Sequence, residues 1–449
     1  MTTRVNGRLN QGDLEIPLTQ SRFTSPSPFF AQLVTPSVMI APAVKRAFEG
    51  QTVSKKPVSK PSIDRGGLEV VFRVQLGVGL MDVTQMSGEP LIAAATADGV
   101  VSFMDAGDGH MTARCDSEDM DAPNAMEFAS KWLVHCSDDC VRIVESAMGK
   151  IVHTHQVAEH SDLDHAIVID GPMFVVAAGR LVHACAVPTG ELQHSMQTAS
   201  AVRAMCAAPR SASQWAYAIA HKEGVRLVSA QGEAVSELSS QRMLRSLDAC
   251  GPWLAAAASD GTVELWDLAR PLSGTNQPHC SLNGNCGSDG ASLCWKGDGA
   301  GLAISGRRAA VFDFTGSNPN HPYRKQSSPP APGWPDSVPR VCMSDGGAQC
   351  VAWSPRASPP DAKVSELATV DKEGVVRLWQ PWGLPLRKGG VGNPSQPHRM
   401  KPQFYTYVKQ DAAHPTSEAM EPCVLKWLCE DVVAVGYYSG EIVAWRVAR

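Results

Sequence analysis

Four histidines and two aspartates lie within one short stretch, HTHQVAEHSDLDH, where they could bind a metal ion. Imidazole nitrogens and carboxylate oxygens are common ligands of transition metals, and the i, i+2 spacing of the first two histidines puts them on one side of a β-strand. The stretch falls between two of the repeated units described below, where an outer, solvated strand and a loop are expected. We therefore interpret it as a polar edge and predict no metal site. The six residues are His153, His155, His160, Asp162, Asp164 and His165.

Other patterns that could support catalysis or metal binding are incomplete. Cys136 and Cys140 are separated by a strand end and a turn, and no second cysteine pair stands nearby, which argues against a zinc site. The sequence has no G-x-S-x-G motif and no P-loop, and LGVGL at 76–80 keeps only part of a dinucleotide-binding pattern. We therefore predict that the protein is not an enzyme, and we identify no cofactor and no small-molecule substrate.

The elements that would position these residues repeat along the chain. In WLAAAASDGTVELWD, an apolar run of strand length is followed by an Asp-Gly turn and by a second strand of alternating character. Most copies of this unit follow one another at about 40 to 45 residues, which is the period of a β-propeller with one four-stranded sheet in each blade. Two longer steps contain Pro- and Gly-rich insertions, at 316–339 and 383–402, without strand periodicity. The eight copies begin at Leu91, Trp132, Met173, Trp215, Trp253, Gly301, Glu366 and Val432.

Further strands complete each unit. One precedes every pair, as MDVTQM does before Leu91, and a fourth is expected between copies, where HMTARCD, the residues around Leu192–Met196 and EAVSELS alternate weakly, as a solvent-exposed edge would. LEVVFRVQL, at 68–76, has no copy of its own, so we predict that it completes the last blade and closes the ring. The predicted fold is all-β: a single closed β-propeller over 68–449, with eight blades favoured over seven, preceded by an extended N-terminal arm over 1–67.

Several residues at repeated positions carry a resemblance to a known family. They are Trp266 with Asp267, Trp379 and Trp445 at the same strand position, and the turn acids Asp98, Asp138 and Asp260. With these residues, 68–449 resembles the WD-repeat family of propellers in a degenerate form. In that family, a strand tryptophan, a turn aspartate, a serine or threonine and a histidine form a hydrogen-bonded structural tetrad. The resemblance implies a propeller fold and a role in protein assembly.

Composition narrows the range of partners. The 449 residues include 40 Lys and Arg against 45 Asp and Glu, a net charge of -5, which gives no overall electrostatic case for nucleic acid or a membrane as the main partner. No run of eighteen apolar residues occurs, so no membrane insertion is predicted. Thirteen scattered cysteines without a C-x-x-C pair indicate a reducing compartment. We expect an intracellular, cytoplasmic protein, with a nuclear or mitochondrial location as the alternative.

Two segments have the character of partner contacts. The arm has nine basic and four acidic residues, opposite in sign to the propeller, and combines an extended basic stretch with an apolar one. The insertion at 383–402 is basic and contains no acid. The alternatives are an arm that folds back on its own propeller and an insertion that is simply solvated. The predicted contact residues are Phe29, Phe30, Lys55, Lys56, Lys60, Arg387, Lys388, Arg399 and Lys401.

A propeller offers a broad, rigid surface built from many loops, and this sequence places no assembled catalytic group on it. We therefore expect a non-catalytic protein-interaction scaffold, a subunit of a larger multiprotein assembly. The alternative is an RNA-associated propeller that uses the basic arm and the 383–402 loop, whose binding would weaken steeply with salt.

Overall fold

The computed structural model divides the chain into two units, Met1–Ala41 and Pro42–Arg449, and every described residue belongs to the second. Three predicted segments lie wholly or mostly outside the described residues: the arm at 1–67, the insertion at 316–339 and the insertion at 383–402. The described residues are 68–77, 79–116, 120–138, 140–157, 163–169, 173–209, 214–268, 276–283, 292–297, 299, 301–306, 309–314, 340–343, 348–355, 367–371, 374–379, 398–400, 404–407 and 422–447.

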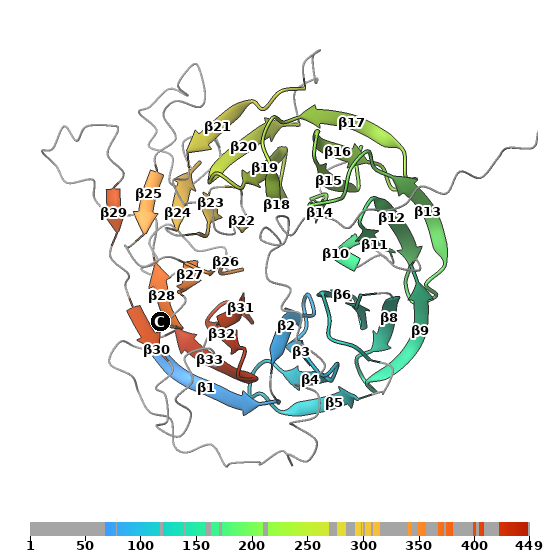
Figure 1. Cartoon of the computed structure of the whole chain (residues 1–449). Helices are drawn as coiled ribbons and strands as arrows, with labels where there is room; N and C mark the ends of the chain where they lie inside the picture. The colour runs from blue at the N-terminus through green and yellow to red at the C-terminus, as the bar shows by residue number, and fades with distance from the viewer. Residues whose placement is uncertain are drawn as a thin grey trace, which may run out of the picture. The chain divides into compact units, whose positions relative to one another are not determined.

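All regular elements in these ranges are β-strands, and they form eight sheets around a central axis (Figure 1). Each sheet is a blade whose strands run in order from the axis to the rim. Blades one to four are β2 (Leu80–Gln85), β3 (Leu91–Thr96), β4 (Val101–Asp105), β5 (Met111–Cys115); β6 (Ala125–Ala129), β7 (Trp132–Cys136), β8 (Cys140–Glu145), β9 (Lys150–Gln156); β10 (Leu163–Ile169), β11 (Met173–Ala178), β12 (Leu181–Ala186), β13 (Leu192–Gln197); and β14 (Ala204–Ala207), β15 (Tyr217–His221), β16 (Gly224–Val228), β17 (Ala234–Ser239).

The second half of the ring repeats this order. Blades five to eight are β18 (Leu244–Cys250), β19 (Trp253–Ala258), β20 (Thr262–Asp267), β21 (Cys280–Asn283); β22 (Leu293–Trp295), β23 (Gly301–Ile304), β24 (Ala310–Asp313), β25 (Arg340–Met343); β26 (Cys350–Trp353), β27 (Leu367–Val370), β28 (Val375–Trp379), β30 (Phe404–Tyr407); and β31 (Pro422–Trp427), β32 (Val432–Tyr437), β33 (Glu441–Val447), β1 (Leu68–Gln75). The predicted all-β propeller is confirmed with eight blades, so the seven-blade alternative is excluded.

The ring closes through β1, as predicted. This strand pairs antiparallel with β33, from Leu68 opposite Val447 to Gln75 opposite Glu441, so the last blade joins strands from both ends of the propeller sequence. Leu68 and Phe72 are buried on it, and Arg73 forms an ion pair with Glu441 at 3.1 Å. Because β33 is covered by β1, it is not left as an open edge.

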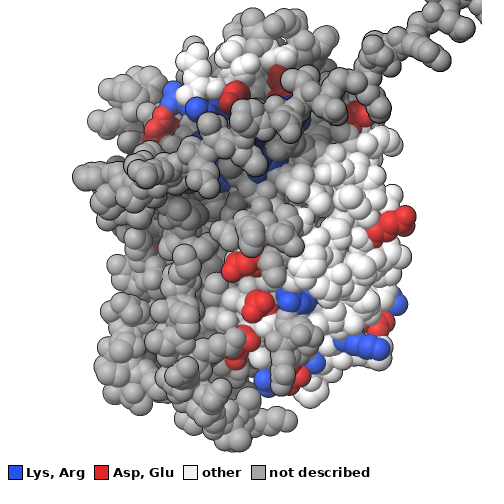
Figure 2. Space-filling model, turned by 45° about the vertical axis from the view of Figure 1, so that its right-hand side comes forward, with Lys and Arg blue, Asp and Glu red and all other residues white. Residues whose placement is uncertain are grey.

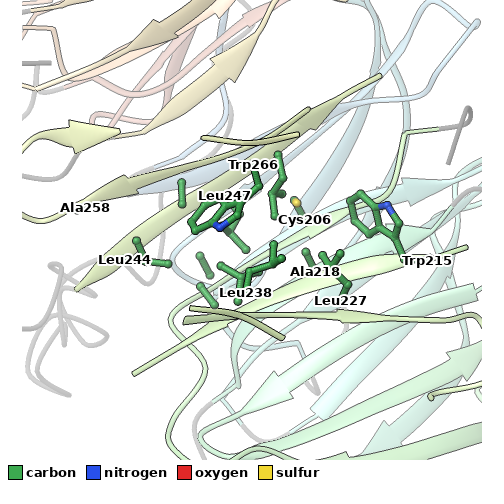
Figure 3. Packing of buried hydrophobic residues seen from close by; sticks show 14 residues of the cluster. Cys206, Trp215, Ala218, Leu227, Leu238, Leu244, Leu247, Ala258 and Trp266 are labelled. Carbon is green, nitrogen blue, oxygen red and sulfur yellow. The ribbon is translucent and has the colours of Figure 1, made fainter. Parts of the chain in front are cut away.

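The hydrophobic core lies between successive blades. The second strand of each blade has sheet neighbours on both sides and packing on both faces, which explains continuous apolar runs such as WLAAAA in β19. One cluster fills the space between blades four and five, where Leu238, Leu244 and Trp266 pack together (Figure 3). Fully burying one such large side chain contributes about 1.5–3 kcal/mol, so blade-to-blade packing is a main source of stability.

The outermost strands alternate between inward and outward side chains, as expected for an edge. HMTARCD, the residues around 192–196 and EAVSELS supply β5, β13 and β17, and KIVHTHQ supplies β9. Their outward positions include exposed apolar residues such as Val152, Leu192 and Val235. On the right-hand side of Figure 2, where the surface residues are described, charged side chains are scattered and do not gather in one patch.

The two insertions occupy the same topological position, the connection between the third and the outermost strand of blades six and seven. The second insertion is not purely a loop, because His398–Met400 forms β29, which pairs in parallel with β25 as a fifth strand of blade six. A strand of three residues is too short for side-chain periodicity to reveal it.

Candidate functional site

A cavity of about 680 Å³ opens beside blade five. It lies among the link from β17 to β18, the β19–β20 turn and the connection from β20 to β21. Its lining is mainly polar, with one exposed methionine, Met243. The lining residues are Gln241, Arg242, Met243, Ser259, Asp260, Glu264, Gln277, Pro278, Cys280 and Ser281.

Glu264 is the buried charge of this pocket. Its side chain is only 5% exposed, and Oε1 lies 3.4 Å from Nε of Arg242, while Oε2 is buried without a hydrogen-bond partner among the described residues. Burial raises the pKa of the carboxyl group, an effect only partly offset by a hydrogen bond from Ser240 and by the charge of Arg242. A buried carboxylate oxygen without a donor is energetically costly.

Arg242 forms ion pairs with two carboxylates, that of Glu264 and that of Asp260 in the β19–β20 turn. Burial works to raise the pKa of Asp260, but hydrogen bonds from Thr262 together with Arg242 outweigh it and hold that pKa below its usual value. The backbone N–H of Thr262 donates to Asp260 at 2.9 Å. With one guanidinium between two carboxylates, the pocket has an acidic balance.

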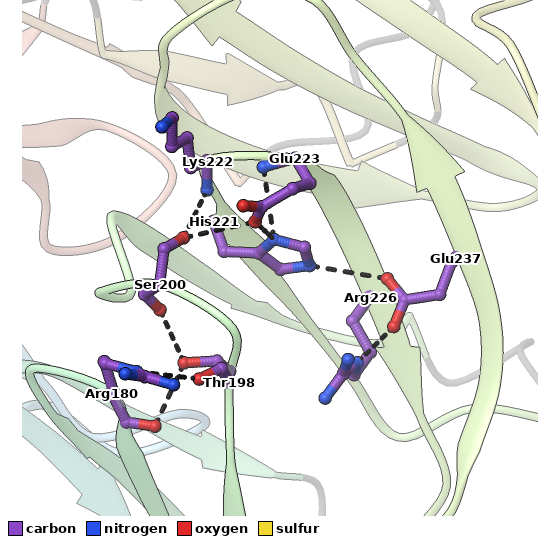
Figure 4. Close-up of polar contacts among 8 residues, drawn as sticks. All are labelled: Arg180, Thr198, Ser200, His221, Lys222, Glu223, Arg226 and Glu237. Atoms are coloured by element: carbon purple, nitrogen blue, oxygen red, sulfur yellow. Dashed lines mark hydrogen bonds and ion pairs between the residues drawn. The ribbon is translucent and has the colours of Figure 1, made fainter.

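A second polar cluster adjoins the pocket on blade four (Figure 4). His221 is buried, with Nδ1 2.9 Å from Oε2 of Glu223 and Nε2 3.4 Å from Oε2 of Glu237, which also pairs with Arg226. The side-chain amide of Asn276, from the β20–β21 connection, donates to the carbonyl of Glu237, so the two sites share one side of the propeller. Imidazole between two carboxylates is a stable polar link rather than an open site, because both ring nitrogens already have partners.

Two half-buried aspartates on innermost strands join neighbouring blades. Asp82 accepts the backbone N–H of Val83 at 2.7 Å and that of Met126 in blade two at 3.2 Å. Asp248 accepts from Ala249 at 2.8 Å and from Trp295 in blade six at 2.6 Å. Burial raises both pKa values, that of Asp248 to about 6. A raised carboxyl pKa is typical of catalytic acids, but these oxygens are engaged with backbone donors.

The predicted turn acids take structural positions. Asp98 accepts from the Thr96 hydroxyl, Asp138 accepts from the Asn124 amide at 3.0 Å, and Asp260 belongs to the pocket described above. Asp371, which the sequence analysis did not single out, has the equivalent structural position in blade seven. It is buried, accepts a hydrogen bond from the N–H of Val375 at 2.8 Å and forms an ion pair with Arg377.

The predicted tryptophans are all buried, but they differ in hydrogen bonding. Trp379 donates from Nε1 to the Thr369 hydroxyl at 2.9 Å. Trp266 has no hydrogen-bond partner for Nε1 among the described residues, and Asp267 follows it, half-buried, at the end of β20. Trp445 packs in the core between blades seven and eight. Of the three tryptophans, Trp379 in blade seven is thus the one with a hydrogen bond to a threonine within the described ranges.

The other predicted residues are placed only in part. Phe29, Phe30, Lys55, Lys56, Lys60, Arg387, Lys388 and Lys401 lie outside the described residues, and Arg399 lies on β29 without a described side chain. Of the histidine stretch, His153 and His155 lie on the outer strand β9 and His165 lies on β10. Among described residues, no three His, Cys, Asp or Glu side chains converge as metal ligands, and the described cysteines are free thiols.

Sequence reasoning did not find the pocket, although one signal was present. In TVELW, Glu264 lies two residues before Trp266 and therefore on the same strand face. A charged side chain on a face that packs against another blade is unusual and signals a buried polar contact. Its partner Arg242 lies in a link between blades, and no strand pattern could have shown that the two meet.

The fold and pocket define a closed eight-bladed β-propeller with an acidic rim pocket. No protein-family model matches the chain, and no curated protein matches it. Among solved structures, the chain is similar to the computationally designed Ika8 protein, with 14% identity, a TM-score of 0.56, and coverage of 83% of this chain and 98% of that one. This likeness supports the propeller fold alone. The described ranges contain no helix of the length and apolar character needed to cross a bilayer.

Proposed function

We propose that the chain is a non-catalytic protein-interaction scaffold of WD-repeat type and a subunit of a larger intracellular assembly. A closed ring of eight blades presents a rigid surface of many loops, which suits simultaneous contacts with other proteins. Partners bind at the propeller faces, with the N-terminal arm and the two inserted segments as additional contacts. Free thiols at the described cysteines agree with the reducing compartment that we propose.

The observation that carries the proposal is the acidic rim pocket, where Arg242 contacts two carboxylates, those of Asp260 and Glu264. A lysine or arginine side chain of a partner would neutralise the excess of carboxylate over Arg242. The pocket is large enough for such a side chain, and Met243 offers an apolar surface for its aliphatic part. The pocket therefore serves as an anchor point for a basic residue at a protein interface.

Affinity purification at mild salt tests the proposal. Tagged full-length protein, a version lacking residues 1–67 and the variant Glu264→Gln are compared by mass spectrometry of the co-purifying proteins. We expect defined partners with the full-length chain, loss of some with the truncation, and loss or weakening of at least one with Glu264→Gln. Glu237→Gln is the matched control, because Glu237 is an acid of the adjoining cluster outside the pocket lining. Recovery of no stable partner would contradict the scaffold function.

The RNA-associated alternative rests on the basic arm and the 383–402 segment, whose side chains lie outside the described part. The same purification, repeated with nuclease and over a salt series, distinguishes it. RNA-mediated recovery would be sensitive to nuclease and would fall steeply with salt, whereas a protein interface anchored at Glu264 would survive nuclease.

A further inference from the structure

Two histidines face each other across the boundary between blades two and three. His155 lies on β9, the outermost strand of blade two, and His183 lies on β12, the third strand of blade three. Their ring centroids are 5.8 Å apart, with the ring planes inclined at 59°. Both residues are half-buried.

Each ring has a buried nitrogen without a hydrogen-bond partner among the described residues. These atoms are Nε2 of His155 and Nδ1 of His183. Buried polar atoms in folded proteins are nearly always satisfied, so a pair of unsatisfied nitrogens needs an explanation. Burial lowers the pKa of both imidazoles, and a neighbouring histidine lowers each further, His153 for His155 and His155 for His183. Imidazole binds a metal in its neutral form, which a lowered pKa favours.

His153 is excluded from this pair by its own packing. Its imidazole covers Gly190 so closely that a Cβ added to that glycine would lie 1.9 Å from Cδ2 of the ring. The i, i+2 spacing of His153 and His155 does put both on the inward side of β9, but the first packs on a turn of blade three and the second faces His183. The structure thus pairs His155 with a residue outside the HTHQVAEHSDLDH stretch.

We propose that Nε2 of His155 and Nδ1 of His183 form a two-imidazole site for a divalent transition-metal ion. With metal–nitrogen bonds of about 2.0–2.1 Å and a tetrahedral or wider angle between them, two imidazole centroids lie about 5–6 Å apart. The observed separation falls within this range. Imidazole suits nickel, copper and zinc, and water fills the remaining positions because no third protein ligand converges there among the described residues. The ion would join the outer strand of blade two to blade three.

Titration of the full-length protein with Ni²⁺ tests the site. Ni²⁺ is chosen because it does not oxidise thiols as Cu²⁺ does, and the purification tag must contain no histidine. His155→Gln and His183→Gln are compared by calorimetry with wild type and with His110→Gln, an exposed histidine of blade one. Since removal of even an outer partner of a metal ligand costs about 10- to 100-fold in affinity, we expect each variant to weaken one Ni²⁺ site by about tenfold or more. The double variant, which keeps neither ligand, should bind at least as weakly as either single one, and His110→Gln should leave this site unchanged.

Two further measurements keep the result decisive if a variant is less stable without metal. Ni²⁺ should raise the Tm of the wild type, because it binds the folded form across two blades, and should raise that of the variants less. In the wild type, Ni²⁺ should protect His155 and His183 from acylation by diethyl pyrocarbonate, read at each residue by mass spectrometry. Unchanged titrations in both variants, equal losses in His110→Gln, or no protection at these two rings would overturn the proposal.

Discussion

Single glycines at rim turns let the outermost strand of one blade lie against the next. Gly190, between β12 and β13, has a φ of 66° and lies directly beneath the ring of His153. Gly190→Ala should lower the free energy of unfolding by about 2–5 kcal/mol, because a left-handed backbone costs a non-glycine residue about 1–2 kcal/mol and overpacking adds about 1–3 kcal/mol. Urea denaturation measures the change.

Gly179→Ala is the matched control for this contact. Gly179 has a similar φ of 55°, but a Cβ there would meet nothing within 4 Å. Its substitution should cost only the backbone part, about 1–2 kcal/mol. Equal losses in the two variants would show that the contact with His153 contributes nothing.

A buried histidine makes stability depend on pH. His135 is fully buried with both ring nitrogens unpartnered among the described residues, and burial, followed by the charge of Arg142, lowers its pKa to about 4. The unfolded chain takes up this proton near pH 6.5 and the folded chain does not. The contribution is therefore fully present above that pH and is lost as the pH falls to about 4, on the order of 3 kcal/mol.

His135→Leu should flatten this part of the stability profile. Unfolding by urea at several pH values between 7 and 4 gives the slope for wild type and variant. Asp248 contributes with the opposite sign, since its raised pKa of about 6 favours the folded state at low pH, but it is common to both proteins and cancels in the comparison. Parallel profiles would rule out His135 as the source.

At the scale of strands, most of the fold could be predicted from the sequence because every blade repeats the same pattern of buried and exposed side chains. A second strand packed on both faces must be continuously apolar, as WLAAAA is, and an edge strand must alternate, as EAVSELS does. What the repeat does not determine was missed. β29 is a strand of three residues, too short for a side-chain pattern to show, and Arg242, the partner of Glu264, lies in a link between blades. The histidine stretch supplies part of the outer strand β9, as the polar-edge interpretation predicts, but no local pattern could show that His155 packs against His183.

Hydrogen bonding of the strand tryptophans differs between blades for a reason visible in the register. Trp379 lies opposite Leu367, and Thr369, two residues further along β27, accepts its Nε1–H. Thr369→Val keeps the shape but leaves a buried donor unpaired, so it should cost about 1–3 kcal/mol. The loss is measured by urea or thermal unfolding.

Blade five offers the reverse experiment. Trp266 lies opposite Leu254, so Ala256 occupies the place of Thr369 and offers no acceptor. Ala256→Ser adds a hydroxyl at that place and should raise the free energy of unfolding by about 0.5–1.5 kcal/mol. A loss on this substitution together with no effect of Thr369→Val would show that the tryptophan N–H groups do not limit blade stability.

At the scale of the whole molecule, the ring depends on one strand that comes from far away in the sequence. β1 buries Leu68 and Phe72 in the last blade and covers β33 along its length. Phe72 also packs over Gly109 of blade one, so it links the two blades that meet at closure. Removing β1 therefore exposes apolar surface on two blades and a long strand edge at once.

We predict that a chain beginning at Leu68 keeps the Tm of the full-length protein, while one beginning at Gly77 unfolds at a much lower temperature and self-associates on size-exclusion chromatography. Phe72→Ala, which keeps the backbone pairing, isolates the packing part and should cost about 3–5 kcal/mol. If the two truncated chains have the same Tm, the contacts between blades stabilise the ring and the strand that closes it does not. If only the shorter chain fails, residues 68–76 are the part of the N-terminal region that folding needs, and the first 67 residues are free to act in partner binding.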